Sequence, residues 1–356
     1  MPPILTALPA LQEMPETGFR RTFRRTISND QLPSLDAGRF VACLGVIIIH
    51  TFGICSSFQN ISAIGRFSVP FFVCTAVFLI AKSILNKPHQ SFLTYFIQRF
   101  NRIYMPFLFW TGFDILVRNG KQMLTGAPFV TLGPYLLANG SASHLWFLPF
   151  IMVLSLSTFF YAQRILPLTW CKWGLLFPLL LGGILVSQHS IPQHINNSNS
   201  DGLLNATYIV NLGWHAFPSV LWSLGLAPFL PQMRWLMEKW RSAKWIALTL
   251  AILLVVGCIF DSDPLLGNLA GLIFFLTTLG VWQGSIVRFM TWAGYYSYGI
   301  YLSHLAWVLG ADFVLVTDRS SISGTKILLI FFIGLVGSLA TSVAISRFNW
   351  LKWTIP

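Results

Sequence analysis

Long apolar runs recur from one end of the chain to the other, and they constrain the fold more than any other feature. A helix needs about 20 apolar residues to cross a bilayer core roughly 30 Å thick. Hydrophobic residues make up 55% of the 356 residues and charged residues only 10%, against roughly 25% charged in an ordinary soluble domain. The runs are solid rather than alternating, which excludes a β-barrel, a soluble enzyme and a disordered chain. We therefore predict an all-α, polytopic membrane protein.

Ten apolar runs are candidate transmembrane helices, although the third and fifth are short. They share a near absence of charged residues and lie near residues 38–58, 67–85, 103–118, 144–163, 173–188, 210–230, 244–261, 265–282, 292–316 and 326–347. No repeat of 20–50 residues connects them, which excludes a repeat array. We expect a single integral-membrane domain over residues 34–350.

The positive charge of the chain follows a topological pattern. The net charge is +12, and most of the 23 Lys and Arg residues fall in an N-terminal tail and in alternate short loops. In a soluble protein this charge would suggest a nucleic-acid partner, but its distribution follows the positive-inside rule. We therefore predict that both termini are cytosolic and that the charges face membrane lipid rather than nucleic acid. Residues 1–33 are expected to form a disordered, basic cytosolic tail.

The longest connections on the predicted outer side are 119–143 and 189–209. The second contains no Lys or Arg and is rich in Asn and Ser. Two interpretations stay open for it, a solvated connector or a segment that covers a bound sugar.

Cysteine usage gives no sign of a metal centre or a disulfide framework. No CxxC pair occurs, and four of the five cysteines fall within apolar runs, as is typical of small buried residues. They are Cys43, Cys55, Cys74, Cys171 and Cys258. We predict no bound metal.

The first predicted span carries three ionisable residues, Asp36, Arg39 and His50. Asp36 and Arg39 are three residues apart and can pair, and a rotation of about 100° per residue brings His50 onto the same helix face. A rise of about 1.5 Å per residue separates Arg39 from His50 by roughly 16 Å, so Arg39 lies at the cytosolic border and His50 deep in the membrane. Such residues mark function by default, although a histidine that only ties two helices together is the alternative.

Two arginines, Arg99 and Arg102, share a helix face just before the third span. Paired guanidinium groups suit the bidentate recognition of phosphate. The alternative is a simple anchor under the positive-inside rule.

Two further spans carry polar residues. His144 and Trp146 open the fourth span on its predicted outer side, and Tyr298, Tyr301 and His304 form a stripe at helical spacing in the ninth. They could line a site, or they could be packed residues with satisfied hydrogen bonds. Three more ionisable residues within spans are interpreted as interfacial, namely Asp114, His215 and Asp312.

These segments, in this order, resemble the acyltransferase-3 family of membrane-bound acyltransferases. Arg39 and His50 are 11 residues apart, as in the family's first-helix signature. Three more segments resemble its R-x-x-R, H-L-W-F and S-Y-x-x-Y-L-x-H patterns, namely Arg99-Phe100-Asn101-Arg102, His144-Leu145-Trp146-Phe147 and residues 297–304. One segment departs from the pattern, because F-F-x-x-S-G-F is replaced by a sequence with Thr75 for Ser and Ala76 for Gly. This departure predicts a change in substrate or acyl choice.

The resemblance implies transfer of an acetyl or other acyl group from cytosolic acyl-CoA, with no bound cofactor. Arg39, Arg99 and Arg102 would hold the donor phosphates, and Asp36 would orient Arg39. His50 would act as general base or as transient acyl carrier, and these two roles stay open.

The resemblance also implies an acceptor, a sugar hydroxyl of a lipid-linked or exported polysaccharide such as an O-antigen or exopolysaccharide. The residues expected to line its site are His144, Trp146, Tyr301 and His304. The expected location is a bacterial inner membrane, with polysaccharide assembly proteins as candidate partners. The rival interpretation is a transporter or flippase for a glycan or lipid-linked sugar, which would often show two halves with matching interrupted helices. No internal duplication is found in the sequence.

Overall fold

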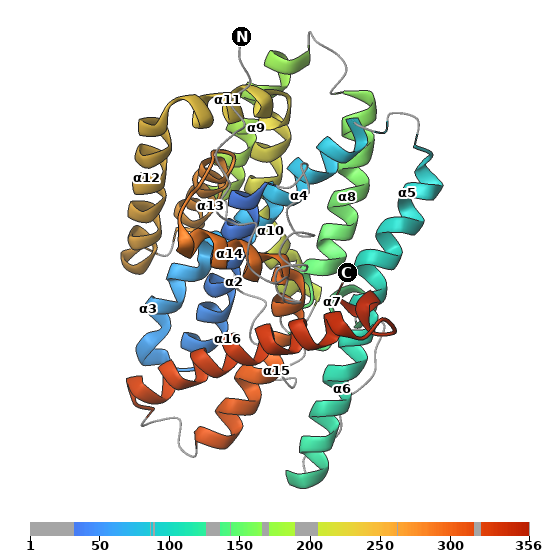
Figure 1. The fold of residues 1–356 in the computed structure, drawn as a ribbon, viewed down its shortest axis with the longest axis vertical. Coiled ribbons are helices and arrows are strands. Elements are labelled where there is room, and N and C mark those ends of the chain that lie inside the picture. Colours follow the sequence, from blue (N-terminus) through green and yellow to red (C-terminus); the bar gives the residue numbers. More distant parts are fainter. Residues whose placement is uncertain are drawn as a thin grey trace, which may run out of the picture.

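The chain folds into a bundle of helices, shown in Figure 1. The computed structural model describes residues 32–85, 87, 90–125, 136–142, 144–165, 171–188, 206–261, 263–316 and 322–355. The helices are α2 (Pro33–Phe52), α3 (Gln59–Ser62), α4 (Ser68–Leu85), α5 (Phe92–Arg99), α6 (Met105–Thr125), α7 (Leu136–Asn139), α8 (Phe147–Arg164), α9 (Cys171–Gln188), α10 (Ala206–Leu226), α11 (Leu230–Lys239), α12 (Arg241–Phe260), α13 (Pro264–Thr278), α14 (Ser285–Tyr295), α15 (Ser297–Leu315) and α16 (Gly324–Arg347).

Six helices of the described residues are long and apolar enough to cross a membrane. They are α2, the run through α3 and α4, α8, α12, α15 and α16. α9 and α13 contribute shorter apolar stretches, and the remaining two predicted spans fall on α6 and α10. The prediction of an all-α polytopic membrane protein is confirmed.

Several predicted boundaries are wrong. α2 ends at Phe52 rather than near 58, because Gly53 caps it and the serine-containing stretch behind it turns through a short 3-10 helix, Ser56–Phe58. α6 continues to Thr125 and so occupies the start of the predicted loop 119–143. Most of the tail 1–33 and residues 189–205 of the second predicted loop lie outside the described residues.

The ninth predicted span, 292–316, is two helices rather than one. α14 ends and α15 begins around Tyr296, whose backbone angles (φ −92°, ψ 6°) lie outside the helical region. The amide of Tyr296 still donates to the carbonyl of Ala293, and the carbonyl of Tyr296 accepts from the amide of Ile300. The break lets α14 lie across the start of α2 while α15 turns into the bundle, so a continuous apolar sequence conceals a change of direction.

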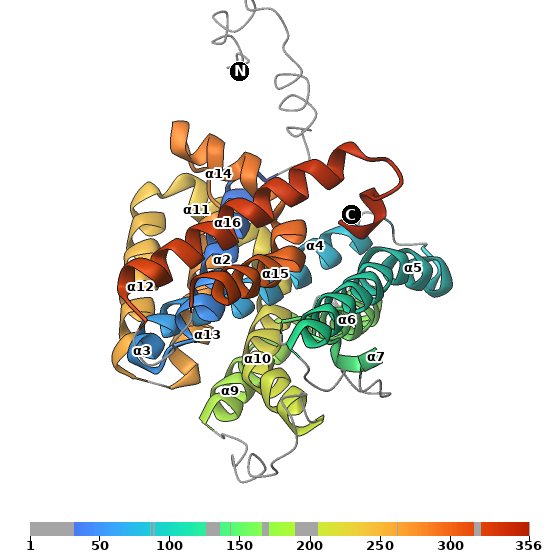
Figure 2. The same cartoon turned by 90° about the horizontal axis from the view of Figure 1, so that it is seen from below.

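α2 is the central helix. It packs against α4, α13, α14, α15 and α16, and Figure 2 shows these elements around it, with α5 and α6 to one side and α11 and α12 to the other. Small residues allow the close approach. A Cβ on Gly294 of α14 would overlap the backbone carbonyl of Asp36, and one on Gly38 of α2 would come within 2.6 Å of Thr278.

This packing predicts that Gly294→Ala destabilises the bundle. The added methyl group meets backbone rather than a flexible side chain, and overpacking of this kind costs about 1–3 kcal/mol. The matched control is Gly310→Ala on α15, where a Cβ meets nothing within 4 Å and helix propensity favours alanine. Thermal unfolding in detergent should show a transition temperature below that of the wild type for Gly294→Ala and not for Gly310→Ala. Equal transition temperatures would contradict the close approach of α14 to α2.

Candidate functional site

The first turn of α2 is held in place from several sides. The amide of Trp282 donates to the Ser34 hydroxyl (2.8 Å), and the Thr291 hydroxyl of α14 donates to the carbonyl of Pro33 (2.9 Å). Within the turn, Arg39 Nη1 donates to Asp36 Oδ1 at 3.1 Å. The ion pair expected from their spacing is therefore confirmed, and it leaves the remaining guanidinium donors of Arg39 available to a ligand.

The second pair of arginines sits at an irregular turn. Residues Phe100–Tyr104, between α5 and α6, form a π-helical turn in which the amide of Met105 donates to the carbonyl of Phe100. Pro106 lacks the N–H that would bond the carbonyl of Arg102 in a regular helix. The Tyr298 hydroxyl of α15 donates to that carbonyl instead, at 3.4 Å. π-Turns occur frequently at functional sites, and this one ties the arginine segment to α15.

Arg99 is placed by a buried tyrosine. Its guanidinium carbon lies 5.0 Å above the centre of the Tyr95 ring, a cation–π arrangement. Tyr95 is only 1% exposed, stacks on Phe159 at 4.5 Å between ring centroids, and donates to the carbonyl of Ser155 at 3.2 Å. α5 and α8 thus provide a rigid support for this cation.

Arg39, Arg99 and Arg102 line a single cavity of about 380 Å³. Its walls come from α2, α4, the α5–α6 junction, α8 and α15. Arg102 lies outside the membrane-spanning helices, and partial desolvation, followed by the charges of Arg99 and Arg39, lowers the pKa of its guanidinium. Three cations that repel one another in one cavity create a site that an anion stabilises.

Three histidines that do not line this cavity lie close together. His50 of α2, His144 in the turn before α8 and His304 of α15 form a triangle. Their ring centroids are 5.3 Å apart for His50 and His304, 6.1 Å for His50 and His144, and 4.8 Å for His144 and His304. The spacing argument placed His50 deep in the membrane but did not bring the other two histidines to it. Within the described chain, no group of three or more His, Cys, Asp or Glu residues has the geometry of a metal site.

Backbone carbonyls define which nitrogens of two histidines carry the proton. His304 Nδ1 lies 2.6 Å from the carbonyl oxygen of Tyr301, and His144 Nε2 lies 3.3 Å from that of Leu302. A carbonyl only accepts, so these nitrogens are the donors and the other nitrogen of each ring keeps its lone pair. His304 is fully buried, and its Nε2 has no hydrogen-bond partner within the described chain. A buried imidazole with a free lone pair is suited to accept a proton or an N–H or O–H donor.

Tyr301 joins the arginine cavity to the histidines. It lines the cavity, its ring centroid lies 5.5 Å from that of His144 and 6.0 Å from that of His304, and its hydroxyl donates to the carbonyl of His144. Phe72 and Phe147, which also line the cavity, complete an aromatic wall with it at centroid distances of 5.9–6.5 Å. Tyr301 therefore contacts both the arginine cavity and two of the three histidines.

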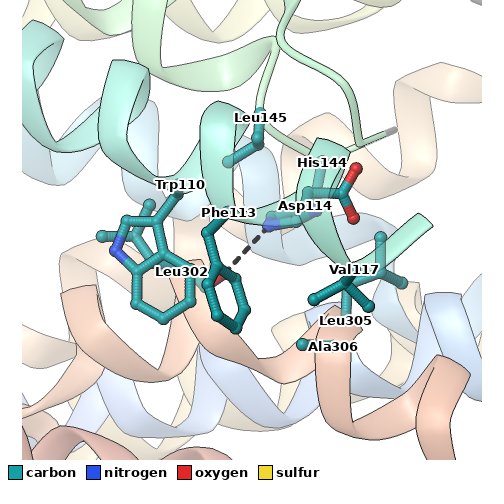
Figure 3. A pocket seen from close by; sticks show the side chains of 9 residues that line it. All are labelled: Trp110, Phe113, Asp114, Val117, His144, Leu145, Leu302, Leu305 and Ala306. Carbon is teal, nitrogen blue, oxygen red and sulfur yellow. Dashed lines mark hydrogen bonds between the residues drawn. The ribbon is translucent and has the colours of Figure 1, made fainter. Parts of the chain in front are cut away.

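A smaller pocket lies beside His144, as Figure 3 shows. Its volume of about 20 Å³ suffices for one water molecule. Asp114 of α6 also lines it, so the interpretation of Asp114 as merely interfacial overlooked a neighbour of the histidine triangle. The available signal was an acidic residue inside a predicted span, but nothing in the sequence pairs α6 with His144.

Trp146 does not line either of these two pockets. It is 7% exposed and packs against Phe147 and Phe150 at centroid distances of 5.8 and 5.7 Å. By contrast, the two positions that depart from the family's pattern, Thr75 and Ala76, both line the arginine cavity.

Comparison with known proteins identifies the family of the chain. The model of the acyltransferase domain family Acyl_transf_3 matches residues 32–347. A protein of Bacillus subtilis (strain 168), YfiQ, which is named by inference as a membrane-bound acyltransferase, is 22% identical over 337 residues, covering 88% of this chain and 91% of that protein. No solved structure matches the chain. The chain belongs to the acyltransferase-3 family of membrane-bound acyltransferases.

Proposed function

We propose that the protein transfers an acetyl group from acetyl-CoA to a sugar hydroxyl of a lipid-linked or exported polysaccharide. The observation that carries the proposal is the cavity of three arginines, one of whose lining residues, Tyr301, contacts His144 and His304 of the histidine triangle. A polyanionic donor and a general base are the two requirements of this reaction. The proposed location is a bacterial inner membrane, where polysaccharide assembly proteins would supply the acceptor.

The donor phosphates bind Arg39, Arg99 and Arg102 in this proposal. Guanidinium groups bind phosphate oxygens in bidentate fashion, and such charge-assisted bonds are about twice as strong as neutral ones. The positive-inside pattern predicts that this end of the bundle faces the cytosol, where acyl-CoA is available. The ion pair with Asp36 holds Arg39 on the cavity wall.

His50 carries the chemistry by one of two routes. As a general base, it takes the proton of the sugar hydroxyl while the sugar oxygen attacks the thioester carbon and CoA leaves as thiolate. As an acyl carrier, its nitrogen first displaces CoA thiolate, and the sugar oxygen then displaces the imidazole. In both routes the proton of the sugar hydroxyl finally passes to the CoA thiolate, so the products are one acetyl ester and one CoA thiol.

The acceptor hydroxyl approaches from the side of His144, His304 and Tyr301. The lone pair on His304 Nε2 is an acceptor for its O–H or for the N–H of His50. Trp146 supports this region through its packing on Phe147, which lines the cavity.

The direct test is thiol release with label transfer. The purified protein in lipid nanodiscs, supplied with radiolabelled acetyl-CoA and a lipid-linked glycan fraction, should release free CoA and place label on the glycan in equal amounts. CoA release without glycan label, in the presence of several acceptors, would overturn the sugar acceptor. Glycan movement across vesicles without any CoA release would favour the transporter interpretation.

Two conservative substitutions separate the roles of the His304 nitrogens. The amide of His304→Asn takes the place of Nδ1 and keeps the bond to Tyr301, whereas the amide of His304→Gln reaches the place of Nε2. If Nε2 acts as acceptor, we expect His304→Asn to lose about 100-fold in kcat and His304→Gln to stay within about 10-fold of wild type. The reverse order would show that His304 is needed only for its bond to the backbone.

A further inference from the structure

Two hydroxyl groups in the arginine cavity have no partner. Thr75 of α4 is 4% exposed and Ser297, the first residue of α15, is 1% exposed; both residues line the cavity. Neither hydroxyl oxygen has a hydrogen-bond partner within the described chain. Several buried hydroxyls of this bundle bond to a carbonyl of the preceding turn, as those of Thr277 and Ser303 do. Four other buried hydroxyls of the described chain also lack a partner, those of Thr51, Ser68, Thr111 and Thr158, but none of these four residues lines the arginine cavity.

Without a ligand, these unsatisfied hydroxyls destabilise the folded protein. A buried donor or acceptor left unsatisfied costs about 1–3 kcal/mol, so a native structure keeps one for a reason. Both oxygens lie just beneath the cavity wall, and rotation about χ1 brings a threonine or serine hydroxyl to a neighbouring staggered position. A ligand in the cavity is thus the natural partner of both groups.

The start of α15 adds a second attraction at the same place. Its N-cap residue, Tyr296, makes no side-chain cap, and its first turn has no acidic residue. The first N–H groups of a helix lack partners within it and carry partial positive charge. The hydroxyl of Ser297 and this helix end together favour an oxygen acceptor.

Position along α15 identifies which part of the donor lies there. Ser297 and Tyr301 are four residues apart, so Ser297 lies about one helical turn, roughly 6 Å, from the aromatic wall. Tyr298, next to Ser297, bonds the backbone of Arg102. The hydroxyls therefore lie between the arginines and the histidines. In acyl-CoA, the pantetheine arm lies between the phosphates and the thioester.

We propose that the hydroxyls of Thr75 and Ser297 hold an amide group of the pantetheine arm of the donor. A hydroxyl both donates and accepts, so the pair matches the carbonyl and the N–H of an amide. The inference rests on the proposed use of acyl-CoA, and it adds that the site recognises an amide of the pantetheine arm. Donors with a pantetheine arm bind well, and simple thioesters bind poorly.

The test uses Thr75→Val, which removes only the hydroxyl, and Thr75→Ser, which keeps it. We expect Thr75→Val to raise KM roughly 3- to 10-fold for both acetyl-CoA and acetyl-pantetheine, with kcat unchanged within twofold. Thr75→Ser should stay near wild type, and Ser297→Ala should resemble Thr75→Val. The acetyl thioester of mercaptoethanol, which has no amide, should show no difference between the variants. The ligand-free Thr75→Val protein should unfold at the wild-type temperature or higher, since it loses an unsatisfied group.

Two results would overturn the inference. Unchanged KM with a lower unfolding temperature would mean that the hydroxyl serves the fold. A fall in kcat with unchanged KM would mean that it acts on the thioester in the transition state rather than on the arm. Calorimetric binding of pantetheine separates this inference from the proposed function. Suppose that the wild type binds pantetheine and Thr75→Val binds it more weakly, but that neither protein releases CoA from acetyl-CoA. The binding site for the pantetheine arm would then be supported, and the proposed acetyl transfer would be rejected.

Discussion

His50→Ala should lower kcat for acetyl transfer by about 10²- to 10⁴-fold, the usual contribution of a positioned base, and an acyl carrier would lose at least as much. The reason is its place in the histidine triangle, with His304 at 5.3 Å and His144 at 6.1 Å between ring centroids. KM for acetyl-CoA should change little, because the arginines proposed to hold the donor line a cavity that His50 does not line. Release of free thiol by purified protein measures both constants.

The matched control is His215→Ala. His215 belongs to α10, and it lines neither the arginine cavity nor the pocket beside His144. Its variant should keep wild-type kcat. If His50→Ala transferred acetyl groups at the wild-type rate in correctly folded protein, His50 would have no part in the chemistry and both proposed routes would be rejected.

The second large effect concerns the arginines. Replacing Arg99 or Arg102 by glutamine should raise KM for acetyl-CoA about 10- to 150-fold, because a hydrogen bond to a charged group contributes about 1.5–3 kcal/mol. Acetyl-pantetheine, which has no phosphate, should show no such change. Lysine at position 99 should recover only part of the affinity, since it retains the charge above Tyr95 but not the bidentate geometry.

Salt dependence gives a second measurement of the same contacts. Added salt should weaken acetyl-CoA binding to the wild type more than to Arg102→Gln. Arg234→Gln is the control, because Arg234 pairs with Glu238 at 2.8 Å on an exposed surface and such pairs contribute little. An equal rise of KM in Arg99→Gln, Arg102→Gln and Arg234→Gln would point to an effect of net charge rather than to a phosphate site.

Features within one helix could be predicted from the sequence. The Asp36–Arg39 pair follows from helical spacing, and the apolar runs predict α2, α8 and α16 because a membrane demands continuous hydrophobicity. The break at Tyr296 escaped prediction, since both helices around it are apolar and the close approach of Gly294 to α2 joins segments far apart in the chain.

Relations between helices could not be predicted in the same way. His50 and His304 are more than 250 residues apart in the chain, and periodicity within each helix says nothing about which faces meet. The three arginines were assigned to one task by resemblance, but their convergence on one cavity with Thr75 depends on the packing of α4 and α15. The meeting of Asp114 with His144 at one pocket could not be predicted for the same reason, because the two residues come from different segments.

Because of the π-helical turn at Phe100–Tyr104, the deletion of a single residue would change the orientation of α5 relative to α6. A π-turn closes its hydrogen bond over five residues instead of four, as the Met105–Phe100 bond does here. Deleting one residue from this turn would restore a regular ladder but rotate everything before it by about 100° relative to α6. Arg99 would then leave the cavity together with Tyr95 and the whole of α5. Natural variation in this segment is therefore expected as substitutions, with insertions and deletions confined to the connections on either side of α5 and α6.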